Sequence, residues 1–278
     1  MKQVKGGVTA AKGFEAASTA AGIKYKDRTD MALVYSQVPC VAAGTFTTNV
    51  VKAAPVKWDQ QVVKSGAKAQ AVVVNSGIAN ACTGAEGFGY CKDTADAAAK
   101  ALNISADGVL IGSTGVIGKQ IPIDKLTAGI EVLAGKKNDT LENGTEAAKE
   151  ALQKALSEDV VDTYNMISVD GDTSTNDSVV LLANGLAENP EITYGTEDYK
   201  KFAEALHTIN EYLAKKIAGD GEGATALFEV KAVGCESVEQ AKTLAKSIVC
   251  SNLTKTAIAG HDANWGRILC AMGYSGAQ

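Results

Sequence analysis

The stretch GVLIGSTGVIG at residues 108–118 does most to define the fold class of this chain. Its first four residues form an apolar run typical of a buried strand, and a Gly-Ser-Thr-Gly turn follows directly at 112–115. Such a turn presents backbone N–H groups and a hydroxyl at the end of a sheet, which can hold the oxyanion that develops during acyl transfer. The same residues also suit an ordinary tight turn with a helix cap, so the rest of the chain must decide between the two.

The composition is that of a globular protein with a large core. The chain has 278 residues, of which 46% are hydrophobic, enough for one large domain or two ordinary ones. Residues 1–14, MKQVKGGVTAAKGF, lack the roughly 7–15-residue apolar core of a secretory signal. No run approaches the ~20 apolar residues of a membrane-spanning helix, so we expect a soluble, cytoplasmic protein without a membrane partner.

The cysteine, histidine and charge content narrows the chemistry. Six cysteines lie far apart without a Cys-x-x-Cys pair, so the sequence predicts neither a zinc site nor a disulfide framework. With two histidines and no His-Glu-x-x-His motif, we expect no metal centre. A net charge of −5 disfavours nucleic acid as a partner, because nucleic acid requires clustered Lys and Arg, and it favours small-molecule substrates.

Apolar periodicity predicts alternating strands and helices. Helical spacing runs over residues 145–160 and 196–217, and Ser237 with Gln240 forms a capping box before a third helix. Four prolines and 28 glycines, many of the glycines at strand ends, favour an α/β fold of layered sheets and helices without a flexible linker. Strands are predicted at seven apolar runs: Ala32–Tyr35, Cys40–Phe46, Ala71–Asn75, Val109–Ile111, Met166–Val169, Val179–Ala183 and Leu227–Val233.

Two further segments place polar residues in turn-like settings. VNSGIANACTG at 74–84 follows a strand that ends at Asn75, and it can aim several donors at one point, although Asn and Gly also suit an ordinary turn. AGHDANWGRIL at 259–269 holds Trp265 and Arg267, which suit a domain interface as well as a ligand. Either segment alone is weak evidence for a binding site.

Another two segments are acidic. VDGDTSTND at 169–177 half-resembles a calcium loop, but its glycine is at the wrong position and no closing glutamate follows, so we expect a structured loop without metal. In AGDGEGATALFEV at 218–230, glycines flank Glu222 and allow backbone to approach closely. A carboxylate held there can grip a substrate ammonium group, whereas a solvated glutamate in a Gly-rich turn is the commoner case.

Together these segments resemble the ornithine acetyltransferase family, the bifunctional glutamate N-acetyltransferases of arginine biosynthesis. One motif match would mean little, whereas seven in the family's order, covering most of the chain, are hard to obtain by chance. The seven are GVTAAKGF at 7–14, TFTTN at 45–49, VNSGIANACTG, STGVIG at 113–118, SVDGDTSTND followed by ANG, GEGAT at 221–225 and DANWGRI at 262–268.

The resemblance implies acetyl transfer from N-acetylornithine to glutamate with no external cofactor. In the family a precursor cleaves itself at an Ala-Thr bond, and the new N-terminal threonine attacks the acetyl group while its α-amine, with a pKa of about 7.7–8.0, accepts the proton. Carried onto this sequence, the oxyanion donors are the Thr114 side chain and the Gly115 backbone N–H, and Glu222 contacts substrate. The family also implies a homo-oligomer and a fold related to the N-terminal-nucleophile-like aminopeptidases and amidases.

The chain departs from the family where the nucleophile should lie. The family's K-G-x-G-M-I-x-P-x-M-A-T-M-L segment is absent, as though some tens of residues had been removed near residues 148–150, and the threonine, its alanine and a substrate-binding lysine are lost with it. Ala226 stands where the family often has lysine, and Thr163, Thr173 and Thr175 are internal. The sequence also stops soon after WGRI, without the family's C-terminal segment.

We therefore predict a main acetyltransferase-like domain over residues 1–232 and a truncated C-terminal α/β subdomain over residues 233–278. Three functions stay open. The first is an acetyltransferase. The second is a catalytically silent homologue that binds acetylated or acidic amino acids, or serves as a subunit beside an intact copy. The third is a non-functional gene fragment. Because removal of strands from a layered fold exposes sheet edges and apolar faces, we also expect a tendency to associate.

Overall fold

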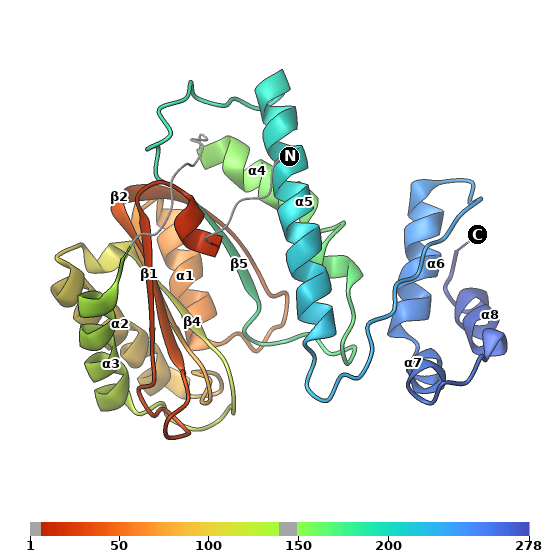
Figure 1. Cartoon of the computed structure of the whole chain (residues 1–278), viewed down its shortest axis with the longest axis horizontal. Helices are drawn as coiled ribbons and strands as arrows, with labels where there is room; N and C mark the ends of the chain where they lie inside the picture. The colour runs from red at the N-terminus through yellow and green to blue at the C-terminus, as the bar shows by residue number, and fades with distance from the viewer. Residues whose placement is uncertain (1–6, 139–148, 278) are drawn as a thin grey trace. The chain divides into compact units, whose positions relative to one another are not determined.

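A computed structural model describes residues 7–138 and 149–277 of the chain, which divides into two compact units. The first unit comprises Met1–Leu156 and Thr173–Lys200, and the second comprises Ser157–Asp172 and Lys201–Gln278. The chain therefore passes between the units three times. Two of these passages lie inside helices, α4 (Lys149–Asp159) and α5 (Glu197–Gly219), both labelled in Figure 1.

The first unit is built on a mixed sheet with the order β1-β2-β3-β4, and β5 pairs with the second half of β2. β3 and β4 are parallel, whereas the other pairs are antiparallel. Pro39 lies within β2 where the β2–β3 register shifts, between Tyr35 and Cys40, as expected for a residue without an N–H for the ladder. The strands are β1 (Phe14–Thr19), β2 (Met31–Phe46), β3 (Ala69–Asn75), β4 (Val109–Ser113) and β5 (Ser178–Ala183).

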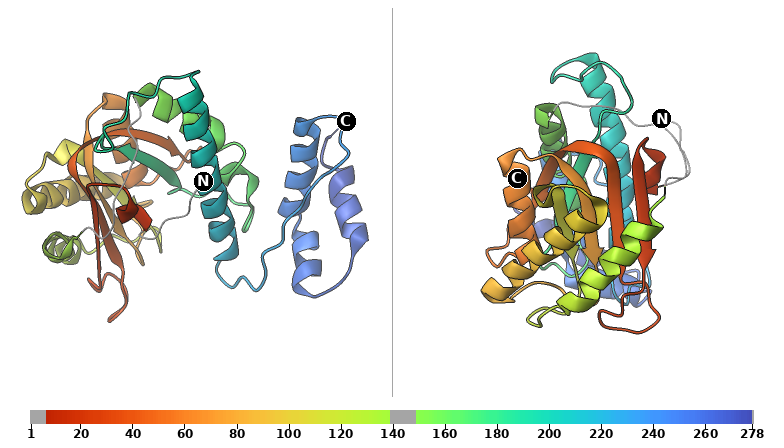
Figure 2. Two further views of the ribbon diagram at one scale, coloured as in Figure 1. Left: turned by 45° about the horizontal axis from the view of Figure 1, so that its top comes forward. Right: turned by 90° about the vertical axis from the view of Figure 1, so that its left-hand side faces the viewer.

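Three helices cover this sheet: α1 (Ala54–Ser65), α2 (Gly84–Leu102) and α3 (Ile123–Lys136). α2 forms the crossover between the parallel strands β3 and β4, and it packs beside α3 (Figure 2). Short 3-10 turns lie at Gly7–Ala10 (η1) and Ala106–Gly108 (η2).

β4 is buried on both of its faces. Successive side chains of a strand point to opposite faces, so Val109 and Ile111 join the core cluster with α2 and α3, whereas Leu110 packs with Val62 and Val63 of α1. Double-sided burial is typical of parallel strands covered by helices. The Gly-Ser-Thr-Gly turn therefore leaves the sheet from a firmly packed strand.

The second unit is helical among the residues that the structure describes. It holds the end of α4, most of α5, a 3-10 turn η3 (Tyr164–Met166), and the helices α6 (Val238–Cys250), α7 (Asn252–Ala259) and α8 (Trp265–Gly273). The predicted capping box opens α6, because Ser237 Oγ accepts from the Gln240 N–H at 3.1 Å and Gln240 Oε1 accepts from the Glu236 N–H at 2.8 Å. In AGHDANWGRIL, the Asn264 side chain accepts from the Arg267 N–H at 3.3 Å and caps α8.

The α/β fold class predicted from the sequence is confirmed, as are five of the seven predicted strands. The runs at 32–35 and 40–46 form one bent strand, β2, and those at 71–75, 109–111 and 179–183 lie in β3, β4 and β5. The helices expected over 196–217 and after Ser237 are α5 and α6. The helix expected from residue 145 is described from Lys149 onward as α4, and its first residues lie outside the described ranges.

The strand predicted at Met166–Val169 is wrong, because lysine side chains satisfy the carbonyl groups that a neighbouring strand would otherwise bind. Lys246 Nζ donates to the carbonyls of Asn165 and Ile167 at 2.7 Å each, and Lys255 Nζ donates to that of Val169 at 2.8 Å. The segment starts in η3 and continues as irregular chain without a ladder.

The strand predicted at Leu227–Val233 is also wrong, because this segment has no ladder partner in the described part of the chain. A strand exists only when another strand supplies its hydrogen bonds, which periodicity in one segment cannot reveal. For the same reason the C-terminal subdomain differs from the expected α/β character, since its described residues 233–277 form α6, α7 and α8 without a strand. The predicted domain boundary after residue 232 stays a prediction. Within the described ranges, no helix combines the length and apolar content needed to cross a bilayer.

Candidate functional site

The candidate site lies where the parallel strands β3 and β4 end side by side. Asn75, the last residue of β3, is paired in register with Ser113, the last residue of β4. The turns that follow both strands therefore share one edge of the sheet, the edge at which open α/β sheets bind ligands. Hydrogen bonds join the two turns, from the Thr114 N–H to the Asn75 carbonyl at 3.0 Å and from the Val116 N–H to the Gly77 carbonyl at 3.2 Å.

Gly115 is required at the tip of the second turn for two reasons. Its φ of +124° lies in a region that other residues rarely adopt. A Cβ at this position would also lie 2.3 Å from the carbonyl carbon of Gly77, closer than any side chain permits. The backbones of residues 115 and 77 therefore touch, and this contact fixes the direction in which the Gly115 N–H points.

Two hydrogen-bond donors at this tip remain unused. The N–H groups of Thr114 and Val116 bind carbonyls of the neighbouring turn, but the intervening N–H of Gly115 has no acceptor among the residues that the structure describes. The Thr114 hydroxyl likewise has no partner in the described chain, and both residues are exposed. A rigid turn that presents an N–H and a neighbouring hydroxyl to solvent has the donor set of an oxyanion hole.

A buried polar network supports the turn from behind. Ser113 Oγ accepts from the Asn80 N–H at 2.9 Å, and the Asn80 side chain donates to the Gly87 carbonyl at 2.7 Å. The Thr83 hydroxyl donates to Asn80 Oδ1 at 2.6 Å, so the oxygen and the nitrogen of this buried side-chain amide are both hydrogen-bonded. VNSGIANACTG thus contributes the platform on which STGVIG rests.

The loop after residue 172 and the TFTTN segment meet at the same edge. The Asn176 side chain donates to the Ser113 carbonyl at 2.6 Å, and Asn49 Nδ2 donates to the Thr173 carbonyl at 2.7 Å. The Thr47 hydroxyl also donates to the Ser174 carbonyl. Four of the motifs noted in the sequence, with more than one hundred residues between the outermost two, therefore assemble around the end of β4 within the first unit.

A buried carboxyl group lies directly beneath this strand. Asp59 of α1 is 3% exposed, and its Oδ1 accepts from the Ile111 N–H at 2.9 Å. Burial raises the pKa of Asp59 to about 8, and the hydrogen bond from Ile111 opposes this only in part. Burial also raises the pKa of the Cys91 thiol to about 12, and the nearby Asp59 carboxylate adds to the rise.

Glu222 lies in the second unit, whereas Thr114 and Gly115 lie in the first. Its side chain is exposed and makes no hydrogen bond or ion pair with the described residues. After Gly223 comes Ala224-Thr225, the one Ala-Thr pair of the sequence, at a distance in the chain from the place where the family's cleavage motif is expected. Thr225 is exposed and lines a cavity of about 520 Å³ within the second unit.

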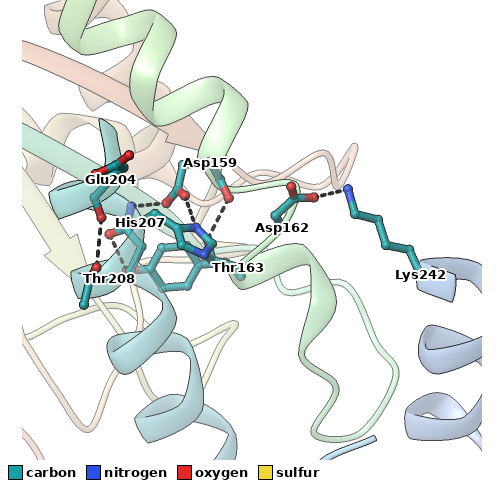
Figure 3. Close-up of polar contacts among 9 residues, drawn as sticks. Asp159, Asp162, Thr163, Glu204, His207, Thr208 and Lys242 are labelled. Atoms are coloured by element: carbon teal, nitrogen blue, oxygen red, sulfur yellow. Dashed lines mark hydrogen bonds and ion pairs between the residues drawn. The ribbon is translucent and has the colours of Figure 1, made fainter. Parts of the chain in front are cut away.

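The second unit also contains a polar cluster that sequence reasoning missed (Figure 3). Asp159 lies at the end of α4, and its Oδ1 is 2.6 Å from His207 Nδ1. Its Oδ2 accepts a hydrogen bond from the Asn210 side chain at 2.7 Å. The Tyr164 hydroxyl extends this hydrogen-bond network by donating to Asn210 Oδ1 at 3.2 Å. The hydroxyl of Thr163 donates to the Asp159 backbone carbonyl at 2.9 Å, so it is engaged in holding the end of α4. Because Asp159 and Tyr164 precede His207 and Asn210 by about fifty positions in the chain, only the structure reveals their association.

Comparison with known proteins identifies the family. A sequence model of the ArgJ family matches residues 15–149 and, separately, residues 143–278. The chain therefore belongs to the ArgJ family. The two matched pieces overlap only at residues 143–149, which is the pattern produced when this sequence has no counterpart for part of the family's length.

Curated relatives are similar over nearly the whole chain. The arginine biosynthesis bifunctional protein ArgJ of Thermotoga neapolitana is 42% identical over 319 aligned positions, which cover 96% of this chain and 80% of that protein. ArgJ 1 of Clostridium acetobutylicum is 43% identical over 317 positions, covering 95% and 78%. These alignments are longer than the 278 residues of the chain, so each relative has residues with no counterpart here. Among solved structures, an ornithine acetyltransferase of Mycobacterium tuberculosis complexed with ornithine is 35% identical, with a TM-score of 0.47, over 68% of this chain and 93% of that chain.

Proposed function

We propose that this chain carries the acyl-binding site of an ornithine acetyltransferase and glutamate N-acetyltransferase of arginine biosynthesis, and that it binds N-acetylornithine without completing the transfer to glutamate. The observation that carries the proposal is the unused pair of donors, the Thr114 hydroxyl and the Gly115 N–H, on a turn that the Asn80 network holds rigid. Family membership supports the substrate class.

The proposed chemistry assigns each donor a task. In the complete reaction a threonine hydroxyl attacks the acetyl carbon, the carbonyl oxygen becomes an oxyanion, and the nitrogen of ornithine leaves with a proton. Thr114 and Gly115 bind that oxygen, and the loss of one such donor costs about 10²–10³ in turnover in enzymes that depend on it. From the family resemblance alone, Glu222 is assigned to a substrate ammonium group.

The same proposal explains why turnover should fail. The family's nucleophilic threonine belongs to the segment that this chain lacks, and the match in two pieces with long alignments supports a gap at that place. The remaining threonines offer no replacement within a folded chain, because attack requires a free α-amine beside the hydroxyl. A chain with an oxyanion turn and no nucleophile can polarise an acetyl group but cannot accept it.

Several further attributes belong to the proposal. They are a cytoplasmic location, small-molecule partners, the absence of a cofactor, and a relation of the fold to the N-terminal-nucleophile enzymes. A non-functional fragment is the competing possibility, and binding separates it from the silent homologue.

The first experiment measures transfer and processing together. Purified chain is incubated with N-acetylornithine and glutamate, and N-acetylglutamate is followed by mass spectrometry, while a denaturing gel reports self-cleavage. We expect no product and a single band. Detectable product would contradict the proposal, and two bands in the wild type but one in Thr225→Ala would identify Ala224-Thr225 as a cleavage site.

The second experiment measures binding by calorimetry with N-acetylornithine. Thr114→Val removes the hydroxyl and keeps the shape, so we expect about tenfold weaker binding, or roughly 1.4 kcal/mol. Thr127→Val is the matched control, because the Thr127 hydroxyl donates only to the Asp124 carbonyl in α3, on a different element. Absence of binding by the folded wild type would favour the fragment instead.

A further inference from the structure

Side chains hold the edge of β4 that faces away from β3. Backbone groups of residues 109, 111 and 113 all bind side chains from other segments, at the two-residue spacing of groups along one edge of a strand. Three side chains therefore act here as a neighbouring strand would. The three contacts run from Trp58 Nε1 to the Val109 carbonyl at 2.8 Å, from the Ile111 N–H to Asp59 Oδ1 at 2.9 Å, and from Asn176 Nδ2 to the Ser113 carbonyl at 2.6 Å.

The contact of Asn176 fixes the peptide unit directly before the N–H of Gly115, the donor that has no acceptor among the described residues. This unit joins the Ser113 carbonyl to the Thr114 N–H, and a peptide unit is planar. Asn176 binds its carbonyl, while its N–H donates to the Asn75 carbonyl at 3.0 Å. Because the unit is held from both edges of the strand, the Gly115 N–H can turn only through the two backbone dihedrals of Thr114.

Thr175 determines which way round the Asn176 amide lies. The Thr175 hydroxyl donates to Asn176 Oδ1, so the Nδ2 hydrogens face the Ser113 carbonyl. A carbonyl can only accept, so a flipped amide would place two acceptors against each other and lose both bonds. The Ala53 N–H also donates to the Thr175 carbonyl at 3.0 Å, which docks the backbone of this loop. The amide therefore reaches β4 in one orientation.

Asn49 offers a comparison, because its amide binds the same loop without reaching β4. Asn49 Nδ2 donates to the Thr173 carbonyl at 2.7 Å, and its Oδ1 accepts from the Val51 N–H at 2.9 Å. Both side-chain bonds of Asn49 in the described chain thus join loop residues, and Asn49 and Asn176 are both half-buried. An amide that only anchors the loop is represented by Asn49, whereas Asn176 also binds the strand that carries the turn at residues 113–118.

We propose that Asn176 is a positioning residue of the acyl site, which holds the Ser113 carbonyl and so keeps the Gly115 N–H directed at the acetyl oxygen of a bound substrate. Thr175 acts through Asn176 by orienting its amide. The identity of the ligand rests on the proposed function, but the order that Asn176 imposes on Gly115 exists without ligand. VDGDTSTND, expected from the sequence to be a structured loop, thereby contributes to the site.

Nuclear magnetic resonance of the full chain tests the positioning role without ligand. We expect the amide order parameter of Gly115 to be about 0.85 in the wild type and below about 0.6 in Asn176→Ala. Thr175→Val keeps Asn176 but lets its amide flip, so its value should lie between these two, and this variant decides the question if Asn176→Ala does not fold. Asn49→Ala is the matched control and should keep the wild-type value.

Three results would overturn the positioning role. They are a wild-type Gly115 order parameter already below about 0.6, an unchanged value in the folded Asn176 and Thr175 variants, and an equal loss in Asn49→Ala. The last result would mean that attachment of the loop, and not the bond to Ser113, orders the turn.

Calorimetry with N-acetylornithine separates this inference from the proposed function. Because a misdirected donor weakens its bond to the acetyl oxygen, we expect Asn176→Ala to bind about tenfold more weakly than the wild type, and Asn49→Ala to stay within about twofold. A folded wild type that does not bind N-acetylornithine contradicts the proposed function, while the order of Gly115 still decides the positioning role. Equal binding by the wild type and Asn176→Ala contradicts the positioning role alone.

Discussion

Gly115 is the residue on which the geometry of the turn at residues 113–118 depends most. Replacement by alanine adds a Cβ in a left-handed conformation and places it against the Gly77 carbonyl, so we expect Gly115→Ala to lower the free energy of unfolding by about 2–4 kcal/mol. Gly118→Ala is the matched control in the same turn, with φ of +74° but nothing within 4 Å of the new Cβ, and should cost about 1 kcal/mol. Urea denaturation of both variants measures the difference. Equal losses would show that the contact with Gly77 carries no energy.

Asp59 should make stability depend on pH in the neutral range. Its pKa of about 8 in the folded protein is above the ordinary value near 3.9, so between these values folding takes up a proton and stability falls as pH rises. Asp59→Asn keeps an oxygen for the Ile111 N–H and removes the pH dependence of stability that this carboxyl group causes. We expect the variant to gain on wild type by about 1 kcal/mol for each pH unit from 5 to 7.5, measured by chemical denaturation. Exposed Asp107 supplies the control, because Asp107→Asn should leave the slope unchanged.

The segment over residues 165–169 shows how an element can be held without a ladder. Two carbonyls depend on Lys246, so Lys246→Met should lower the free energy of unfolding by about 2 kcal/mol and speed limited proteolysis at this segment. Lys242→Met removes a partly exposed ion pair with Asp162 from the same helix and should cost less than about 1 kcal/mol. If both variants lose the same free energy of unfolding, the two carbonyl contacts of Lys246 stabilise the protein no more than a surface ion pair does.

Sequence periodicity predicts elements well when their partners are also apolar and regular. The runs that became β2, β3, β4 and β5 were recognisable because burial on a sheet imposes its own pattern. The runs at 166–169 and 227–233 have the same pattern. Lysine ammonium groups bind the carbonyls of the first run, and no residue of the described chain binds the backbone of the second. Partner choice is a property of the fold and is not encoded in one segment.

Helix α2 and the candidate site are features that the sequence pattern alone did not reveal. α2 begins with glycines at 84, 87 and 89, which hide its helical pattern, although Gly87 is needed there because a Cβ would lie 1.9 Å from Thr83 Oγ1. The sequence of STGVIG predicts a turn with free donors, but it suits an ordinary turn as well, and only the other motifs favoured the first interpretation. Its support by Asn80, 33 residues earlier, could not be predicted, because that contact exists only after β3 and β4 pair in parallel.

The two compact units differ greatly in how much apolar surface they bury. Most of the buried hydrophobic residues belong to the first unit, whereas the described second unit buries only Leu206, Ala214, Ile248 and Ala271. Large hydrophobic side chains such as Ile209, Tyr212 and Ile217 of α5 are exposed there instead. Because burial of apolar area is the main source of folding stability, the second unit should be the weaker of the two.

The two tryptophans make this difference measurable, since one lies in each unit. Trp58 of α1 donates to the Val109 carbonyl at 2.8 Å and packs 6.1 Å from the Phe88 ring, whereas Trp265 is 72% exposed. In Trp265→Phe, fluorescence therefore reports the first unit alone, while circular dichroism at the helix band reports both. We expect the dichroism to fall at lower urea than the Trp58 fluorescence, because α6, α7 and most of α5 unfold before the sheet. Superimposable curves would contradict this prediction, because they would mean that the two units unfold in one transition.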